Sequence, residues 1–83
     1  MNYNVYILWS DRLQQYYCGQ TNDFNDRFYR HNSGQSQSTA RGIPWIVVKI
    51  IEVPSRSEAL RLEKKIKKRG ISRFLKDNER YSV

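Results

Sequence analysis

Apolar and aromatic side chains dominate two short stretches near the start of the chain, with a polar interval between them. In residues 3–9, YNVYILW, every second side chain is apolar or aromatic, which is typical of a β-strand. Residues 10–13 supply a turn, and residues 15–21, QYYCGQT, have the aromatic content of a return strand. The pattern therefore predicts an antiparallel hairpin.

The position of the turn predicts which tyrosines share a face of this hairpin. A turn centred between Asp11 and Arg12 places Tyr6 directly opposite Tyr17, on the same side of the ladder. Cys18 alternates with Tyr17 and should point to the other side as a small core residue. We therefore expect two phenols to share one patch of the sheet, while strand propensity and packing explain the other tyrosines of the hairpin.

A helix is predicted to follow the hairpin over about residues 23–33. Asn22 can cap it, because its side-chain oxygen can accept an unpaired amide proton of the first turn. Gly34 ends the helix. Residues 33–42, SGQSQSTARG, then form a polar loop.

The second half of the chain predicts one strand and two helices. Residues 45–53, WIVVKIIEV, are the most hydrophobic run, which predicts a central strand buried on both faces. Ser55 and Glu58 have the spacing of a capping box, which opens a helix over about residues 55–69. A short helix over about residues 71–77 follows. The order β-β-α-β-α-α predicts a small mixed sheet with helices packed on it.

The charge balance points to a phosphate-rich partner. The chain has 15 Lys and Arg against 8 Asp and Glu, a net charge of +7, and residues 61–69, RLEKKIKKR, hold six of these cations. Such a surface favours nucleic acid, and a solvated basic face that only improves solubility is the alternative. The expected nucleic-acid-binding residues of this run are Lys64, Lys65, Lys67, Lys68 and Arg69.

The composition excludes several classes of protein. A single cysteine rules out an internal disulfide, and no cluster of cysteine and histidine offers a zinc site. The first residues show no basic segment followed by a long apolar run, so we expect neither a signal peptide nor a membrane anchor. We therefore expect one domain over residues 1–83, a cytoplasmic location and no membrane partner.

Two predicted helices carry ionisable residues beside their apolar positions. In the first helix, Phe24, Phe28 and His31 form one stripe, and Arg27 lies one turn before His31. In the second helix, Glu63 lies at the rim of the apolar stripe, where an acid is unfavourable unless it is paired or binds a metal. Each residue has a structural alternative: a satisfied histidine, a snorkelling arginine, or a glutamate paired with the lysine four residues later.

Together these side chains form a set suited to phosphodiester cleavage. If the helices pack beside the tyrosine patch, phenol, guanidinium, imidazole and carboxylate converge. Glu63 would hold Mg²⁺ or a similar hard cation, and Arg27 would neutralise the charge of a phosphorane. A tyrosine or His31 would transfer protons.

The same residues stand in an ordered series of motifs. The chain reads VYIL, then YCGQT, then NDFNDRFYRHNSG and then SEALRLEKKIK. In this order the motifs resemble the GIY-YIG endonuclease domain, most of all its small stand-alone bacterial branch, over about residues 3–69. The resemblance implies an α+β fold with a small three-stranded antiparallel sheet flanked by helices. It also implies an endonuclease that cuts nucleic acid, above all DNA in repair or recombination, with one divalent cation, Mg²⁺ or Mn²⁺.

The resemblance further implies a role for each matching residue. Tyr6 and Tyr17 match the tyrosines of the two half-motifs. Tyr6 would be the general base toward the attacking water, and Tyr17 would bind water or phosphate. Arg27 matches the arginine that contacts the scissile phosphate. His31 stands where several members carry a histidine that assists proton transfer, and Glu63 matches the carboxylate that binds the metal.

The sequence departs from the family pattern at several points. Asn-Val precedes Tyr6 in place of Gly-Ile, and Cys18 replaces an isoleucine, although the hydroxyls that carry the chemistry are kept. Larger members use a polar residue near the end of the domain, for which Asn78 is the candidate. Family nucleases usually owe their target choice to an attached domain, so we expect poor sequence specificity or guidance by a protein partner.

Two other functions stay open. A basic module that binds nucleic acid without cleaving it would rely on residues 61–69. Thr39 and Arg41 in the polar loop are further candidate phosphate contacts, with an ordinary solvated loop as the alternative. A subunit of a repair or recombination complex would bind nucleic acid weakly and act through a partner. A carboxylate facing two tyrosines favours the nuclease, since a binding module has no need of it.

Overall fold

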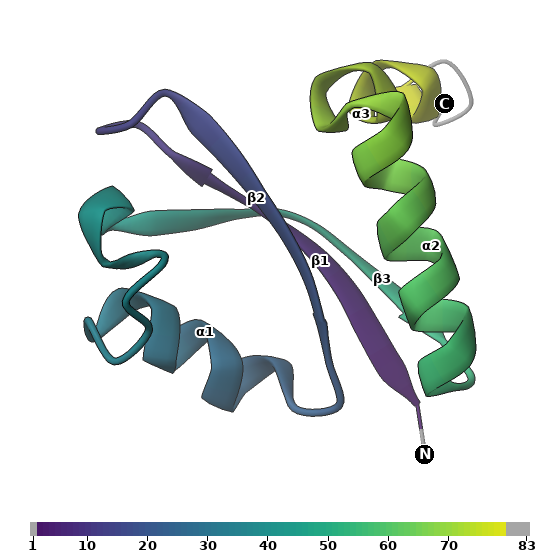
Figure 1. The fold of residues 1–83 in the computed structure, drawn as a ribbon, viewed down its shortest axis with the longest axis horizontal. Coiled ribbons are helices and arrows are strands. Elements are labelled where there is room, and N and C mark those ends of the chain that lie inside the picture. The colour runs from purple at the N-terminus through teal and green to yellow at the C-terminus, as the bar shows by residue number, and fades with distance from the viewer. Residues whose placement is uncertain (1, 80–83) are drawn as a thin grey trace.

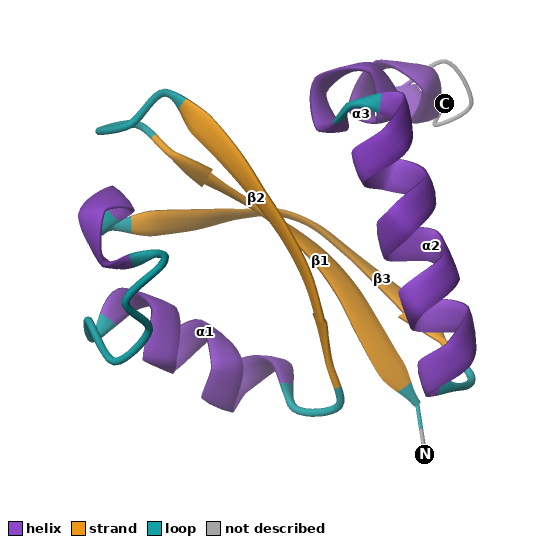
Figure 2. Cartoon of the chain, in the orientation of Figure 1, coloured by secondary structure: helices purple, strands orange, loops and turns teal. Residues whose placement is uncertain are grey.

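The computed structural model describes residues 2–79 of the 83-residue chain, which form a three-stranded sheet between helices (Figure 1). The α+β class and the element order β-β-α-β-α-α predicted from the sequence are confirmed (Figure 2). None of the helices within residues 2–79 combines the length and apolar character needed to cross a membrane. In chain order the elements are β1 (Tyr3–Ser10), β2 (Gln15–Thr21), α1 (Phe24–Asn32), the 3-10 turn η1 (Ala40–Gly42), β3 (Trp45–Val53), α2 (Arg56–Arg69) and α3 (Ile71–Glu79).

The turn of the hairpin is displaced from the position that the sequence pattern predicts. Residues 11–14 form a four-residue loop that side chains at both of its ends hold in place. Ser10 Oγ accepts the Leu13 amide proton at 3.1 Å, and the Gln14 side chain donates to the backbone oxygen of Asp11 at 2.8 Å. Gln14 itself adopts a positive φ of 55°. The centre of the turn therefore lies one residue later than expected.

This displacement of the turn changes the register of the hairpin. Tyr6 pairs with Gly19, and Tyr17 pairs with Leu8, so the predicted pairing of Tyr6 with Tyr17 is wrong by two residues. Because side chains alternate between faces with a period of two, an even shift leaves both phenols on the same face. The two rings are diagonal neighbours with centroids 6.3 Å apart.

The sheet order is β2-β1-β3, and both pairings are antiparallel. The three-stranded antiparallel sheet implied by the resemblance is therefore confirmed. The central strand is β1, so the mixed sheet and the central β3 expected from the hydrophobic pattern are wrong. Strand β3 lies at one edge of the sheet. Three of its apolar side chains, Ile46, Val48 and Ile50, are between 43% and 54% exposed. An apolar run indicates strand propensity, but it does not specify which neighbours the strand acquires.

Helices cover both faces of the sheet, with α1 on one side and α2 and α3 on the other (Figure 1). The buried residues on the α2 side are Val5, Ile7, Cys18, Ala59 and Ile66. Those on the α1 side are Tyr6, Leu8 and Trp45, with Tyr17 packed against them. The alternation of side chains along β1 therefore divides the hairpin between two small cores and assigns both site tyrosines to the α1 side.

The helix starts follow the capping chemistry of the sequence, with one correction. The Asp23 carboxylate caps α1 by accepting the Asp26 amide proton at 3.2 Å, whereas Asn22, the predicted cap, lies one residue earlier. A carboxylate is also favoured at this positive end of the helix. Ser55 accepts the Glu58 amide proton at 3.3 Å, which confirms the predicted start of α2.

Candidate active site

The ring of Tyr6 lies across the backbone of Gly19. Both residues are buried, and they are direct partners in the pairing of β1 with β2. A Cβ atom at position 19 would lie 2.6 Å from the hydroxyl oxygen of Tyr6 and 3.1 Å from Cε2 of Tyr17. No side chain fits at such distances, so a glycine is required for Tyr6 to occupy this position. This close contact explains why Tyr17-Cys18-Gly19 ends in glycine.

Helix α1 brings His31 to the two phenols. The predicted stripe is confirmed, since Phe24 and Phe28 pack on the sheet and His31 is only 1% exposed. The His31 ring centroid lies 5.7 Å from that of Tyr6 and 5.0 Å from that of Tyr17. Three polar rings therefore meet in an otherwise apolar layer.

A chain of hydrogen bonds runs from Tyr6 into the polar loop. The Tyr6 hydroxyl lies 2.9 Å from Nε2 of His31, and Nδ1 of His31 lies 2.9 Å from Oγ1 of Thr39. The Thr39 hydroxyl donates to the Ser36 carbonyl oxygen at 3.3 Å. Tyr6, His31 and Thr39 are each at most 1% exposed, so the chain is closed to solvent along its length.

These partners specify the tautomer of His31. A hydroxyl has one proton, and Thr39 uses it toward Ser36, so Thr39 can only accept from Nδ1–H of His31. Nε2 of the neutral ring is then the acceptor, and Tyr6 donates its phenolic proton to it. His31 is thus held as a base whose unprotonated nitrogen faces Tyr6.

The protonation states agree with this arrangement. Burial lowers the pKa of His31 below 6.5, and the positive charge of Arg27 lowers it further, so the ring is neutral at neutral pH. Burial also raises the pKa of Tyr6, and the charge of Tyr17 adds to the effect. Arg27 acts on Tyr6 in the opposite direction, by charge and hydrogen bonding. An ionised Tyr6 would therefore depend on Arg27 for stabilisation.

The two phenols differ in accessibility. Tyr6 exposes 0% of its surface, whereas Tyr17 is half-buried. Arg27 is exposed, although it lies close enough to Tyr6 to influence its pKa. From the α1 side, Tyr17 and Arg27 are therefore the groups that a large substrate can contact directly.

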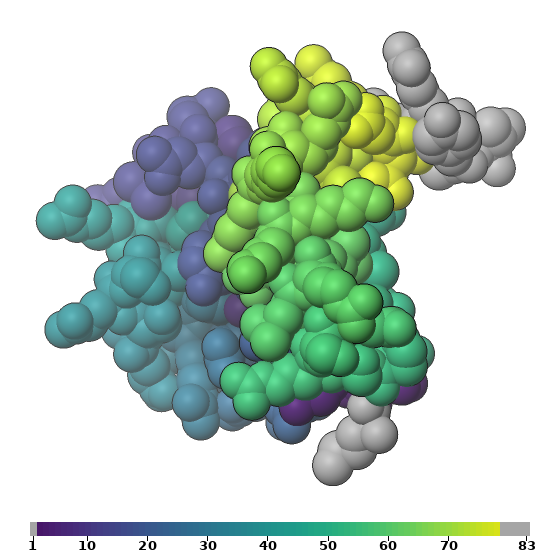
Figure 3. Space-filling view, turned by 45° about the vertical axis from the view of Figure 1, so that its right-hand side comes forward, coloured from purple at the N-terminus to yellow at the C-terminus, as the bar shows by residue number. Residues whose placement is uncertain are grey.

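Glu63 approaches from the other side of the sheet. It belongs to α2, which packs on the face that carries Cys18, and β2 lies at the sheet edge between α1 and α2 (Figure 3). Burial raises the pKa of Cys18 to about 11, with the Glu63 charge as the second cause. The same charge also raises the pKa of Tyr6. Tyr6, Tyr17, His31 and Arg27 thus gather on one face, and Glu63 stands across the edge strand.

The surroundings of Glu63 restrict the kind of metal site that it can form. Its carboxylate accepts a hydrogen bond from Nζ of Lys67 at 2.7 Å, and this bond is the main reason why the pKa of Lys67 is raised. Within the described residues, no three His, Cys, Asp or Glu side chains lie together as a metal cage. The donor set therefore fits a Mg²⁺ or Mn²⁺ ion that keeps most of its waters and takes further oxygens from substrate phosphates.

The predicted nucleic-acid-binding residues are all exposed and lie on two regions of the surface. Arg41 belongs to η1. Lys65, Lys68 and Arg69 line a cavity of about 370 Å³ together with Arg73 of α3, while Lys64 is exposed elsewhere on α2. Two of these cations are paired: the Lys67 ammonium group with Glu63, and the Arg69 guanidinium with Asp77 at 2.8 Å.

Asn78 does not join the tyrosine cluster. Its side chain donates to the Phe74 carbonyl oxygen of its own helix at 2.8 Å. It lines a cavity of about 310 Å³ with residues of α2 and α3, on the opposite face from Tyr6. Nothing in this position connects Asn78 with the chemistry expected from the sequence.

Two polar residues have roles that the sequence did not indicate. Thr39 was a candidate for a surface phosphate contact, but it is fully buried, and Trp45 Nε1 donates to its carbonyl oxygen at 2.7 Å. Asn32, the last residue of α1, exchanges two hydrogen bonds with the Trp45 backbone through its side-chain amide, at 2.6 and 3.1 Å. Both residues fasten the loop after α1 to β3, and no local pattern signals such long-range bonds.

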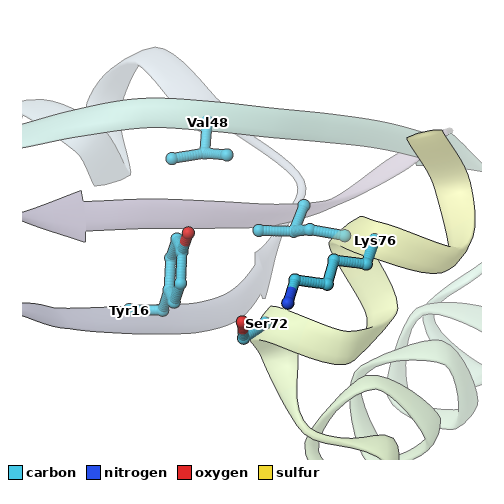
Figure 4. A pocket seen from close by; sticks show the side chains of 5 residues that line it. Tyr16, Val48, Ser72 and Lys76 are labelled. Atoms are coloured by element: carbon cyan, nitrogen blue, oxygen red, sulfur yellow. The ribbon is translucent and has the colours of Figure 1, made fainter.

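A separate cavity of about 350 Å³ lies at the hairpin end of the sheet. Figure 4 shows Tyr16 of β2 and Val48 of β3 facing Ser72 and Lys76 of α3. It lies on the α3 side of the sheet and is lined by none of the predicted catalytic residues. It is therefore distinct from the tyrosine cluster.

Comparisons with known proteins agree with this geometry. The model of the GIY-YIG catalytic domain matches residues 2–75. The solution structure of the UPF0213 protein BH0048 from Bacillus halodurans is similar at 37% sequence identity and a TM-score of 0.50, covering 81% of this chain and 71% of that one. No curated protein sequence matches significantly. Since the family model spans nearly all of the described residues, the chain belongs to the GIY-YIG family.

Proposed function

We propose that this protein is an endonuclease that hydrolyses phosphodiester bonds of DNA with the help of one divalent cation. Membership of the GIY-YIG family supports nuclease-type chemistry and implies a nucleic-acid substrate. The observation that carries the proposal is the buried chain of hydrogen bonds from Tyr6 through His31 to Thr39. A protein that only binds nucleic acid needs no oriented proton acceptor behind its surface.

The accessible groups would contact the substrate. Arg27, exposed beside the tyrosine cluster, would bind the scissile phosphate and stabilise the charge that develops on it. Tyr17 is the half-buried phenol, so it would meet the attacking water or a phosphate oxygen first. This division of roles differs from the family expectation of direct contact between Tyr6 and water, because Tyr6 has no exposed surface.

The buried pair would accept the proton of the attacking water. Since Tyr6 has no exposed surface, the neighbouring Tyr17 would receive the proton from water and release its own to Tyr6, which already donates toward Nε2 of His31 at 2.9 Å. His31 is suited to this transfer because burial lowers its pKa and keeps it neutral at neutral pH. Thr39 would keep Nε2 as the acceptor.

Glu63 would hold the cation through a carboxylate oxygen, in exchange for its contact with Lys67. When bound, Mg²⁺ or Mn²⁺ would supply positive charge at the phosphate oxygens. The position of Glu63 across the edge strand means that the substrate would lie along β2, with α1 and α2 on either side.

A nicking assay tests the proposal. Supercoiled plasmid incubated with the protein and Mg²⁺ or Mn²⁺ should be nicked, and Glu63→Ala should abolish nicking. Glu52→Ala is the matched control, because it removes one exposed carboxylate from β3, on the far edge of the sheet. Equal activity of the wild-type protein and Glu63→Ala would exclude the catalytic role of this carboxylate.

The second candidate is a nucleic-acid-binding module without catalysis. Four cations around one cavity at the junction of α2 and α3 favour it: Lys65, Lys68, Arg69 and Arg73. It predicts salt-sensitive binding that is lost when Lys65 and Lys68 are replaced by Glu and is unchanged by Tyr6→Phe. Binding without nicking under any metal condition would support this module over the nuclease.

A further inference from the structure

Two helices of the protein begin at the same corner of the sheet. Figure 1 shows α1 and α2 both starting near the end of β2, where β1 begins. A cavity of about 170 Å³ lies at this corner. The residues that line it are Tyr3, Gln20, Thr21, Asn22, Arg27 and Arg56. Apart from the ring of Tyr3 the lining is polar, and it contains no carboxylate.

The two arginines occupy helix positions that do not favour cations. Arg56 is the first residue of α2, and Arg27 is the fourth residue of α1. The N-terminal end of a helix carries partial positive charge, so a guanidinium there is repelled by the helix that presents it. Within the part of the chain that the structure describes, neither guanidinium has a carboxylate at ion-pair distance. The cavity therefore presents two guanidinium groups and no carboxylate in its lining, while the Asp23 carboxylate caps α1 next to it.

We propose that this corner binds a backbone phosphate of the nucleic acid adjacent to the one that is cleaved, with Arg56 as its principal ligand. The proposal rests on the nuclease function proposed above, and it assigns a role to Arg56, which the family motifs do not include. Guanidinium groups present several N–H donors in a plane, so two of them from different helices suit a tetrahedral anion. The amides of Gln20 and Asn22 add neutral donors at the same place.

The phosphate of a nucleic-acid strand fits this corner better than a free anion. Arg27 lines the cavity and also acts on Tyr6, so one arginine connects the corner with the candidate active site. The corner lies at the end of β2, the edge strand that separates Tyr17 from Glu63. A strand that follows β2 from the candidate site would place a neighbouring phosphate there.

Binding without cleavage tests this assignment. Fluorescence anisotropy would measure the affinity for a short single-stranded DNA in EDTA, for the wild-type protein and for Arg56→Gln. The control is Arg12→Gln, which removes one exposed cation from the hairpin loop at the opposite end of β2. We expect Arg56→Gln to weaken binding about tenfold. It should also reduce the slope of log K against log salt by about 0.7, the value for one phosphate of a single strand.

Arg56→Lys refines the comparison, because it keeps the charge and removes the planar donors. We expect its affinity to lie between those of the wild-type protein and Arg56→Gln. Arg56→Gln should fold normally, since it removes a cation from a positive helix end, and an unchanged Tm would verify this. Equal losses for Arg56→Gln and Arg12→Gln would overturn the assignment.

A titration with inorganic phosphate separates the two possible sources of the anion. Shifts of the Arg27 and Arg56 Nε–H NMR signals at phosphate concentrations far above those needed with DNA would support a backbone phosphate. Equal affinities for phosphate and DNA would identify a free-anion site and overturn the assignment. Failure of the nicking assay with Arg56-dependent DNA binding intact would reject only the nuclease function.

Discussion

The phenolic hydroxyl of Tyr6 lies 2.9 Å from Nε2 of His31, and neither side chain has more than 1% of its surface exposed. Residue type and spacing in the sequence point to both residues, yet their contact is formed by segments 25 residues apart. On the far side of the imidazole, Thr39 accepts the proton of Nδ1, so the nitrogen that faces Tyr6 is the unprotonated one. The pair is therefore oriented by a residue from a loop.

Thr39→Val should disturb both the tautomer of His31 and the stability of the fold. Without the hydroxyl, Nδ1–H of His31 is buried without a partner, which costs about 1–3 kcal/mol of unfolding free energy. Thr39→Ser keeps the acceptor and should be close to the wild-type protein. Nitrogen-15 NMR of the imidazole distinguishes the tautomers. Nε2–H as the main form in the wild-type protein would contradict the proposed direction of the hydrogen bonds.

The pH dependence of stability should report on His31, the only histidine in the chain. Its pKa in the folded state lies below 6.5, first because of burial and then because of Arg27. Below pH 6.5 the unfolded chain therefore binds a proton that the folded protein does not, so stability is complete above this pH and falls as the pH decreases. Urea denaturation from about pH 8 to pH 5 measures the effect, and His31→Gln should remove it from this window.

Gly19→Ala should displace Tyr6. The added Cβ would lie 2.6 Å from the Tyr6 hydroxyl oxygen, and relief of such a contact in a packed core costs about 1–3 kcal/mol. The control is Gly34→Asn, because an added Cβ at position 34 has no atom within 4 Å and asparagine tolerates the positive φ of 83° there. Chemical denaturation compares the stabilities. An unchanged Tyr6–His31 contact in Gly19→Ala, seen by NMR, would contradict the steric explanation.

Glu63→Gln should abolish metal-dependent cleavage while leaving the fold intact. Loss of a metal that stabilises the transition state by several kcal/mol lowers the rate by about a hundredfold or more, whereas an exposed i,i+4 pair contributes only about 0.3–0.5 kcal/mol to stability. Single-turnover cleavage measures the effect on the rate, and thermal denaturation measures the effect on stability. A large loss of Tm would indicate that Glu63 is mainly structural.

Lys67→Gln should strengthen metal binding. The Lys67 ammonium group donates to the Glu63 carboxylate at 2.7 Å, so it competes with any cation for the same oxygen. Its removal should raise the affinity for Mn²⁺ several-fold in the presence of DNA, as measured by electron paramagnetic resonance. Lys64→Gln is the control, because it removes one exposed charge from the same helix without a contact to Glu63. Weaker Mn²⁺ binding in Lys67→Gln than in Lys64→Gln would mean that Lys67 supports the carboxylate.

The sequence by itself determined the local structure and the identity of the main candidates. Alternating side chains specified the strands, the Ser55 and Glu58 spacing specified the start of α2, and the apolar stripe of α1 placed His31 toward the sheet. These features depend on residues within a few positions of one another, which is the range over which backbone geometry imposes a period. The prediction that Tyr6 and Tyr17 share a face is also confirmed, because the observed register differs from the expected one by two residues, an even number.

Only the tertiary structure decided how these parts combine. A loop over residues 11–14, one residue later than the expected turn, pairs Tyr6 with Gly19, and β1 rather than β3 occupies the centre of the sheet. The packing of α2 on the opposite face puts Glu63 across the edge strand from the phenols, and the folding of the polar loop buries Thr39 against His31. Such arrangements depend on the free energy of packing between segments that are distant in sequence. Periodicity and capping patterns are local, so they contain no information about this packing.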